Sequence, residues 1–180
     1  MPRRSEPTAE VHGYSDHGGT PVGWSTGRDA VRDAEVLWIS TVRPDGRPST
    51  SPVVAVWHDD ALWFTTSAHE RKARTLAENP HCTLATTHGS PSADLDVVLE
   101  GPAERIADHE TLRTFVTAFT EKYGTDPWDL RAVEGGVVHD DPATPGIRPI
   151  EFSVFRVHPV LGAGFRHGVV SSQTTWDFTR

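Results

Sequence analysis

The chain of 180 residues is 36% hydrophobic and 23% charged, and its 17 Lys and Arg residues against 25 Asp and Glu residues give a formal net charge of −8. This acidic balance argues against a general nucleic-acid binder, because affinity for the phosphate backbone depends on clustered cations, and no apolar run approaches the roughly 18 residues that a membrane span needs. With a single cysteine, Cys82, which suits a reducing compartment, the composition predicts a soluble cytoplasmic protein of one main domain.

The first 33 residues have the composition of an arm. Residues 1–30 contain five Gly and three Pro, and their only aliphatic side chains larger than alanine are Val11 and Val22. Such a stretch buries too little apolar surface to offset its ordering entropy unaided. We therefore predict an extended or partly disordered arm over 1–33, with Tyr14 and Trp24 as its anchors, followed by a folded domain over 34–180.

Three short strands open the folded domain. Residues 36–42 are rich in β-branched and aromatic side chains and end at the turn sequence Arg43-Pro44-Asp45-Gly46. A second strand is predicted over 49–57, where Pro52 indicates an edge or a bulge. A third covers 61–65 after a turn at 58–60. Tight turns between consecutive strands predict an antiparallel meander.

Two helices and further strands complete the domain. A helix is predicted from His69 to about Glu78, and a second, capped by Asp108 and closed by Gly124, carries apolar residues at i, i+3, i+4 and i+7. Strands are expected over 82–86, 95–106 and 150–155, with one or two more in 159–178, whereas 124–148 reads as irregular. Many short strands without β-α-β alternation predict an α+β fold that is mainly antiparallel β, in the form of a barrel.

The most informative local pattern lies where the strand at 61–65 gives way to a helix. It consists of three consecutive hydroxyl residues followed by three cations: Thr65, Thr66, Ser67, Arg71, Lys72 and Arg74. Hydroxyls, free backbone N–H groups and the positive end of the helix dipole converge at such a junction and suit a phosphate group. A lysine there acts as a point charge, and an arginine binds two phosphate oxygens. The commoner alternative is an ordinary capped surface helix with a solvated basic face.

Other patterns point away from familiar catalytic sites. The glycines at 162, 164 and 168 do not have the G-x-G-x-x-G spacing of a dinucleotide site, so a loop or a strand bend is predicted there. The ten histidines lack metal-ligand spacing, and one cysteine cannot form a zinc knuckle. Cys82 reads as a buried structural thiol. Trp176, in a polar tail, is expected to line a pocket or close a dimer interface.

The order of these elements resembles the pyridoxamine-5′-phosphate-oxidase-like, flavin-binding split β-barrel superfamily. The resemblance covers about residues 34–180 and is carried by eight segments, namely the strand at 36–41, the turn at 43–48, Ser51-Pro52-Val53, Leu62-Trp63-Phe64-Thr65, Arg71-Lys72-Ala73-Arg74-x-Leu76, Asn79-Pro80, Leu99-Glu100-Gly101-Pro102-Ala103-Glu104 and Thr174-Thr175-Trp176-Asp177-Phe178. It implies a six-stranded split β-barrel with two or more flanking helices. It also implies a homodimer with two cofactor sites at the interface.

The resemblance further implies which residues hold the cofactor. The expected phosphate ligands are Thr65, Thr66, Ser67, Arg71 and Lys72, with Arg74 as a further candidate. The backbone around Ser51, Pro52 and Val53 is expected to lie against the isoalloxazine or deazaflavin ring. Trp176 is expected to contribute from the partner subunit, although Thr175 replaces the arginine that precedes it in the family motif.

Departures from the family pattern narrow the expected activity. The strand at 49–54 lacks the arginine of true pyridoxamine phosphate oxidases, and the tail lacks their R-L-H element. The resemblance therefore favours the branch that uses FMN or the deazaflavin coenzyme F420, with hydride transfer to or from a small organic substrate and no side chain as acid or base. The alternatives are a non-enzymatic barrel that binds or carries a flavin, haem or another planar ligand, and a cofactor-free dimeric interaction module.

Overall fold

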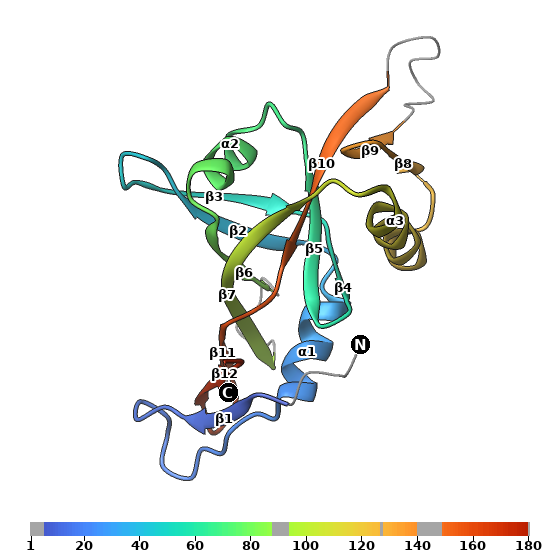
Figure 1. The fold of residues 1–180 in the computed structure, drawn as a ribbon. Helices are drawn as coiled ribbons and strands as arrows, with labels where there is room; N and C mark the ends of the chain where they lie inside the picture. The colour runs from blue at the N-terminus through green and yellow to red at the C-terminus, as the bar shows by residue number, and fades with distance from the viewer. Residues whose placement is uncertain (1–5, 88–93, 127, 140–148, 180) are drawn as a thin grey trace.

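The computed structural model describes residues 6–87, 94–126, 128–139 and 149–179. Twelve strands and three helices follow one another in this part of the chain (Figure 1). In chain order they are β1 (Thr8–Val11), α1 (Trp24–Asp33), β2 (Leu37–Val42), β3 (Pro48–Val53), β4 (Ala55–His58), β5 (Ala61–Thr66), α2 (Arg71–Glu78), β6 (His81–Ala85), β7 (Leu95–Ile106), α3 (His109–Tyr123), β8 (Leu130–Val133), β9 (Gly136–His139), β10 (Ile150–Val157), β11 (Leu161–Arg166) and β12 (Ser172–Asp177). None of the described helices is long and apolar enough to cross a membrane.

The twelve-residue strand β7 organises the sheet, in which every described pairing is antiparallel. One edge of β7 pairs with β6, which leads on to β2 and β3. Its other edge pairs first with β11 and then with β10. From β11 the sheet continues to β12 and β1. From β10 it continues to β5 and β4 on one side and to the β8–β9 hairpin on the other. The sheet curls without closing, as Figure 1 shows. The predicted α+β, mainly antiparallel split barrel is therefore confirmed.

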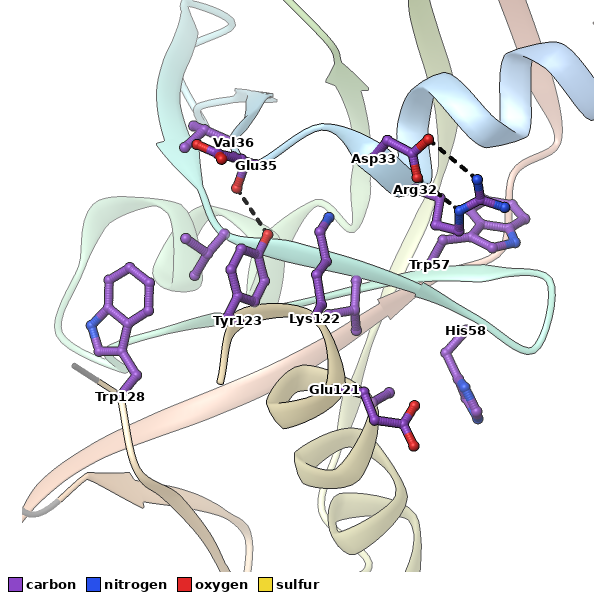
Figure 2. A pocket seen from close by; sticks show the side chains of 13 residues that line it. Arg32, Asp33, Glu35, Val36, Trp57, His58, Glu121, Lys122, Tyr123 and Trp128 are labelled. Atoms are coloured by element: carbon purple, nitrogen blue, oxygen red, sulfur yellow. Dashed lines mark hydrogen bonds and ion pairs between the residues drawn. The ribbon is translucent and has the colours of Figure 1, made fainter. Parts of the chain in front are cut away.

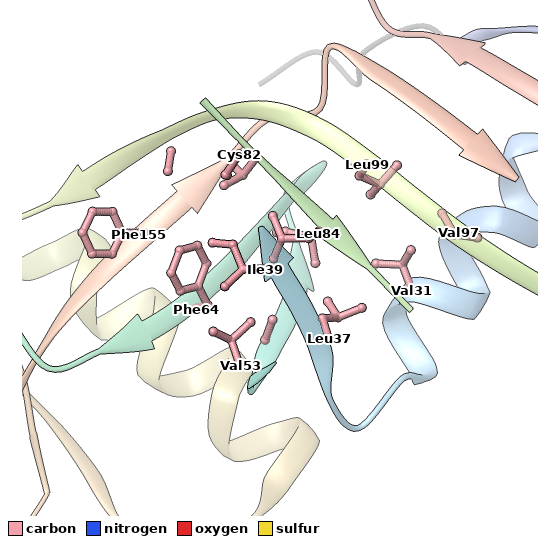
Figure 3. Packing of buried hydrophobic residues seen from close by; sticks show 14 of the residues in the cluster. Val31, Leu37, Ile39, Val53, Phe64, Cys82, Leu84, Val97, Leu99 and Phe155 are labelled. Carbon is pink, nitrogen blue, oxygen red and sulfur yellow. The ribbon is translucent and has the colours of Figure 1, made fainter. Parts of the chain in front are cut away.

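Two hydrophobic clusters fill the molecule, and β5 contributes to both. Leu62 and Phe64 enter the cluster inside the barrel, where the ring of Phe64 stacks on Phe155 with centroids 5.4 Å apart (Figure 3). Ala61 and Trp63 point the other way, into the cluster beneath α3. Successive side chains of a strand face opposite sides, so a strand buried on both faces reads as the continuous apolar run Ala61–Phe64.

The segment before residue 34 differs from the predicted arm. Residues 24–33 form helix α1, and Trp24 and Val31 belong to the cluster inside the barrel. Strand β1 adds to the sheet by pairing with β12. Trp24 is thus an anchor as expected, whereas Tyr14 is 88% exposed. The expected boundary at residue 34 does not divide the described structure, because the tail of the chain supplies the apolar partners that the first 33 residues lack.

Trp176 occupies a slot whose walls are glycines. Its side chain is fully buried, and Nε1 donates a hydrogen bond to Val22 O at 2.9 Å. A Cβ at Gly27 would lie 2.7 Å from Cη2 of Trp176, and one at Gly164 would lie still closer. A Cβ at Gly162 would also meet the ring, and both Gly162 and Gly164 lie within the regular strand β11, so the predicted loop or bend is wrong for these two. It is confirmed for Gly168, which lies in a bend after β11.

This burial also corrects the role predicted for Trp176. Its whole ring lies inside the core of its own chain, where it packs against Trp24 with centroids 5.3 Å apart. No face of the ring is left to line a pocket, to close a dimer interface or to contact a cofactor held by a partner subunit. The aromatic residue in this polar tail serves to hold α1 against β11 and β12.

Two further differences concern short elements. The segment predicted as irregular contains the β8–β9 hairpin, while residues 140–148 lie outside the described part. The strand predicted over 49–57 is interrupted at Val54, between β3 and β4. The second predicted helix is α3, and it follows the prediction closely. Asp108 caps it by accepting the N–H of Thr111 at 2.8 Å, and Gly124 ends it with φ at +74°.

The glycine slot yields a test of stability. Gly164→Ala places a methyl group against the Trp176 ring, and we expect overpacking to lower the free energy of unfolding by about 1–3 kcal/mol. Urea denaturation measures the loss as a lower midpoint at unchanged slope. Gly13→Ala is the matched control, since a Cβ there meets nothing within 4 Å. Equal midpoints for the two variants would contradict the slot.

Candidate functional site

The junction between β5 and α2 brings a buried hydroxyl to the start of a helix. Thr66, the last residue of β5, lies on the same strand face as Phe64 and is 3% exposed. Its hydroxyl donates a hydrogen bond to Oε2 of Glu70 at 2.9 Å. Glu70 is the N-cap residue of α2 by position, yet its side chain makes no capping bond to the helix. The first N–H groups of α2 therefore have no side-chain cap.

A second donor reaches the same carboxylate oxygen. The ammonium group of Lys72 hydrogen-bonds Oε2 of Glu70, and the Lys72 side chain is only 14% exposed against 48% for Glu70. The bond from Lys72 lowers the pKa of Glu70, the bond from Thr66 adds to this, and partial burial opposes both. Glu70 is therefore an ionised carboxylate on which one donor from β5 and one from α2 converge. Sequence reasoning passed over Glu70, whose only signal was an acidic residue directly before two cations.

The other predicted phosphate ligands are arranged differently. Thr65 alternates with Thr66 along β5, so its side chain faces the cluster beneath α3 and not Glu70. The three consecutive hydroxyls consequently do not share one face of the strand, and a phosphate-binding role for Thr65 stays a prediction. The Ser67 hydroxyl accepts the N–H of His69 at 3.3 Å within the connecting loop. Arg71 and Arg74 are exposed on α2, on the same short helix as Lys72.

The segment expected to contact a cofactor ring lies on an edge strand. Within the described residues β3 pairs only with β2, with Pro52 opposite Trp38, which confirms the edge position expected from the proline. Ser51 and Val53 share one face of β3, and Val53 belongs to the cluster inside the barrel. β3 also contacts β5. Ser51 on β3 and Thr66 on β5 therefore both face the inside of the barrel.

A separate cavity of about 770 Å³ lies beside β4, between the C-terminal ends of α1 and α3 (Figure 2). Its aromatic lining consists of Trp57, Tyr123 and Trp128. Nothing in the sequence alone brings β4 to the end of α3 and to Trp128, because β4 is far from both along the chain.

Two neighbouring residues at the end of α3 hold this region together. Nζ of Lys122 donates to Ala34 O at 2.7 Å and to Ala55 O at 2.8 Å. The hydroxyl of Tyr123 donates to Glu35 O at 2.8 Å and accepts the N–H of Ala55 at 3.2 Å. Burial lowers the pKa of Lys122 to about 8, and Asp33 and Glu35 only partly offset this. These bonds, which we call the Lys122–Tyr123 clamp, join α3 to the entry of β2 and the first residue of β4.

The single thiol is not part of either site. Cys82 is buried, and burial raises the pKa of its thiol to about 12, so it stays protonated and unreactive near neutral pH. The expected buried structural thiol is thus confirmed. Over the ranges that the structure describes, no group of three or more His, Cys, Asp or Glu side chains is placed to hold a metal ion.

Comparison with known families identifies the chain. The family model described as Pyridoxamine 5′-phosphate oxidase matches residues 26–160. A pyridoxine/pyridoxamine 5′-phosphate oxidase of Bacteroides thetaiotaomicron is 33% identical over 82 residues, which are 45% of this chain and 38% of the relative. One of Yersinia pestis is 36% identical over 84 residues, 46% of this chain and 38% of the relative. The chain thus matches well under half the length of these relatives, and it belongs to the pyridoxamine 5′-phosphate oxidase family.

Solved structures share the fold at low identity. A pyridoxamine 5′-phosphate oxidase-related, FMN binding protein from Nostoc punctiforme has a TM-score of 0.56 at 18% identity, covering 83% of this chain and 87% of that chain. An F420 reductase has a TM-score of 0.52 at 19% identity, covering 75% and 94%. A heme binding protein from Mycobacterium smegmatis has a TM-score of 0.58 at 21% identity, covering 81% and 55%. These likenesses establish the fold.

The low pKa of Lys122 predicts a pH dependence of stability. Its pKa is about 8 in the folded chain against an ordinary value of 10.5, so between these values the unfolded chain binds more protons. The contribution of Lys122 to the free energy of unfolding is therefore constant below about pH 8 and rises with pH above it. In chemical denaturation from pH 7 to 10, the free energy of unfolding of the wild-type protein should rise relative to that of Lys122→Met above pH 8. Parallel curves for the two proteins would rule this out.

Proposed function

We propose that this family member binds a flavin-type cofactor, FMN or F420, by its phosphate at the β5–α2 junction and transfers a hydride between that cofactor and a small organic substrate. The observation that carries the proposal is the convergence of Thr66 and Lys72 on one anionic oxygen, that of Glu70. These two donors, beside uncapped N–H groups at the start of α2, are the set that a phosphate oxygen requires. The carboxylate of Glu70 is the anion that stands in that position.

The proposed roles follow from the placement of the side chains. Lys72 and Thr66 bind phosphate oxygens, and Arg71 and Arg74 add positive charge from the exposed side of α2. Ser67 lies beside this site, in the loop between β5 and α2. The backbone of Ser51, Pro52 and Val53 lies against the ring, on an edge strand whose inner face also leads to Thr66. The cofactor supplies the hydride chemistry, and the chain binds it, orients it and excludes water.

The ligand must displace Glu70 to use these donors. A phosphate monoester carries a charge of about −1.5 to −2 at pH 7, so it cannot share Lys72 with a carboxylate at short range without repulsion. Glu70 is about half exposed, which leaves it free to turn toward solvent when a phosphate enters. In this proposal Glu70 keeps Lys72 and Thr66 in place until the ligand arrives.

We further propose that the protein works as a homodimer with the cofactor at the interface. Large apolar side chains are exposed around β2, at Val36, Trp38 and Val42, each about 40% exposed. Trp38 lies beside Pro52 of the edge strand β3, so the apolar patch adjoins the proposed ring-binding segment. A second copy of the chain would cover this patch and help to enclose the ring.

A carrier without turnover is the second candidate, because one structure that shares the fold is named as a heme binding protein. The same barrel would then hold a flavin, haem or another planar ligand and release it unchanged. Oxidation of the reduced cofactor in the presence of enones and quinones separates the two functions. Stoichiometric binding without turnover across such a panel would favour the carrier. Cytoplasmic location stays a prediction in either case.

Cofactor binding through Lys72 is directly testable. Fluorescence titration of the purified protein with FMN and with F420 should show saturable uptake of one of them. Lys72→Ala should weaken that binding at least about tenfold, since a hydrogen bond to a charged group contributes about 1.5–3 kcal/mol. Arg113→Ala, an exposed cation on α3, is the matched control. Uptake of neither cofactor by the wild-type protein would end the proposal.

The competition by Glu70 predicts a gain on mutation. Glu70→Gln keeps the shape of the side chain but removes its charge, so FMN should bind about tenfold more tightly, as expected for removing one nearby like charge from a partly exposed site. Glu78→Gln, at the other end of α2, should leave the affinity unchanged. Weaker binding by Glu70→Gln would instead mean that Glu70 is needed to orient Lys72 in the complex.

A further inference from the structure

The cavity beside β4 has no role in the proposed phosphate site, but two of its lining residues, Val36 and Val54, lie next to the segment proposed to contact the cofactor ring. We infer that this cavity receives the organic substrate, and that it selects planar, conjugated molecules without negative charge. This inference rests on the proposed function, because it takes the molecule in the cavity to be the partner in hydride transfer, which must lie next to the cofactor. The location, the aromatic lining and the charges of the cavity each support it.

The location follows from strand register. Val36 and Val54 line the cavity, and their chain neighbours Leu37 and Val53 pair across β2 and β3. Val53 is the last residue of the segment proposed to lie against the cofactor ring, so the cavity begins where that segment ends. Ala55 pairs with Phe64, which is two residues before Thr66. The start of β4 is therefore about 7 Å along β5 from Thr66, with the cavity on the α3 face of these strands and Thr66 on their barrel face.

The lining suits a flat ligand. Trp57, Tyr123 and Trp128 present aromatic rings from β4, from the end of α3 and from the segment that follows it. Tyr123 and Trp128 are perpendicular, with centroids 6.2 Å apart, and Trp128 is 38% exposed. Figure 2 shows these rings spread around one space. The volume of about 770 Å³ is within the range of about 300–1,000 Å³ of small-molecule sites, where aromatic walls bind planar rings.

The charges of the lining disfavour anions. Asp33, Glu35 and Glu121 line the cavity together with two cations, Arg32 and Lys122, and with the imidazole of His58. Both cations are already engaged. Arg32 bonds Asp29 and Asp33 at 2.8 Å, and Lys122 donates to two backbone carbonyls.

An anionic ligand would therefore meet three carboxylates, while Arg32 is already paired with two carboxylates and Lys122 has one N–H left to donate. A neutral conjugated ligand avoids that penalty. It would also enter a cavity whose walls are already fixed by the Lys122–Tyr123 clamp, which lowers the ordering cost of binding.

Binding of a matched pair of probes tests the cavity itself. Calorimetric titration of the purified protein with 1,4-naphthoquinone and with its 2-sulfonate should show at least about tenfold tighter binding of the uncharged quinone. Trp128→Ala should weaken naphthoquinone binding about tenfold through the loss of one aromatic wall. Tyr14→Ala, which removes an aromatic ring that is 88% exposed and does not line the cavity, should leave binding unchanged. Equal binding of the two probes, or an equal response to both substitutions, would overturn the inference.

A kinetic measurement separates this inference from the proposed function. In cofactor-loaded protein, Trp128→Ala should raise the KM for naphthoquinone about tenfold while kcat changes little, because the residue binds substrate and does not touch the reacting atoms. If the cofactor-loaded protein is active and Trp128→Ala leaves its KM for naphthoquinone unchanged, the inferred substrate cavity is wrong and the proposed function still holds. A protein that loads neither cofactor would overturn both.

Discussion

The alternation of side chains along β5 is the constraint on which the rest of the structure depends. Because β5 is buried on both faces, Phe64 goes into the barrel and Trp63 goes beneath α3, and the strand cannot shift register by one residue without exchanging the two cores. The same period places Thr66 on the barrel side and Thr65 on the other. The end of the strand therefore offers one hydroxyl, not two, to whatever lies at the start of α2.

This period also explains how much of the candidate site the sequence could predict. The hydroxyl and basic residues were recognised as a group, and the helix that carries Lys72 was predicted near its true bounds. The direction of each side chain was not, since a run of three hydroxyls looks continuous in sequence and alternates in space. A role for Glu70 was not predicted for a related reason. Only the fold shows that a carboxylate between cations turns back to meet Thr66.

Contacts between distant parts of the chain account for the errors in the fold. Local signals were sufficient for the strand at 95–106 and for the cap of α3, because an apolar alternation and an Asp N-cap act over a few residues. The arm was misjudged because its stability comes from residues about 150 positions away. Trp176 needs Gly27 beside its ring and Val22 O at its Nε1. No composition of residues 1–30 alone reveals a partner supplied by the tail.

The alternation of side chains through β3 and β4 gives the two candidate binding regions their relation. It continues across the break at Val54, because Val53 and Ala55 belong to the cluster inside the barrel while Val54 and Val56 face the cluster beneath α3. Val54 therefore lines the cavity, and its neighbour Ala55 is held by the Lys122–Tyr123 clamp. Lys122 holds its position at a cost, since burial lowers its pKa, and such a cost persists in a structure only where the surrounding bonds fix it. The clamp thus fixes the end of the segment at 51–53 against the start of the cavity, so in the proposed function the spacing between cofactor and substrate would be set by α3, which lies outside the proposed phosphate site.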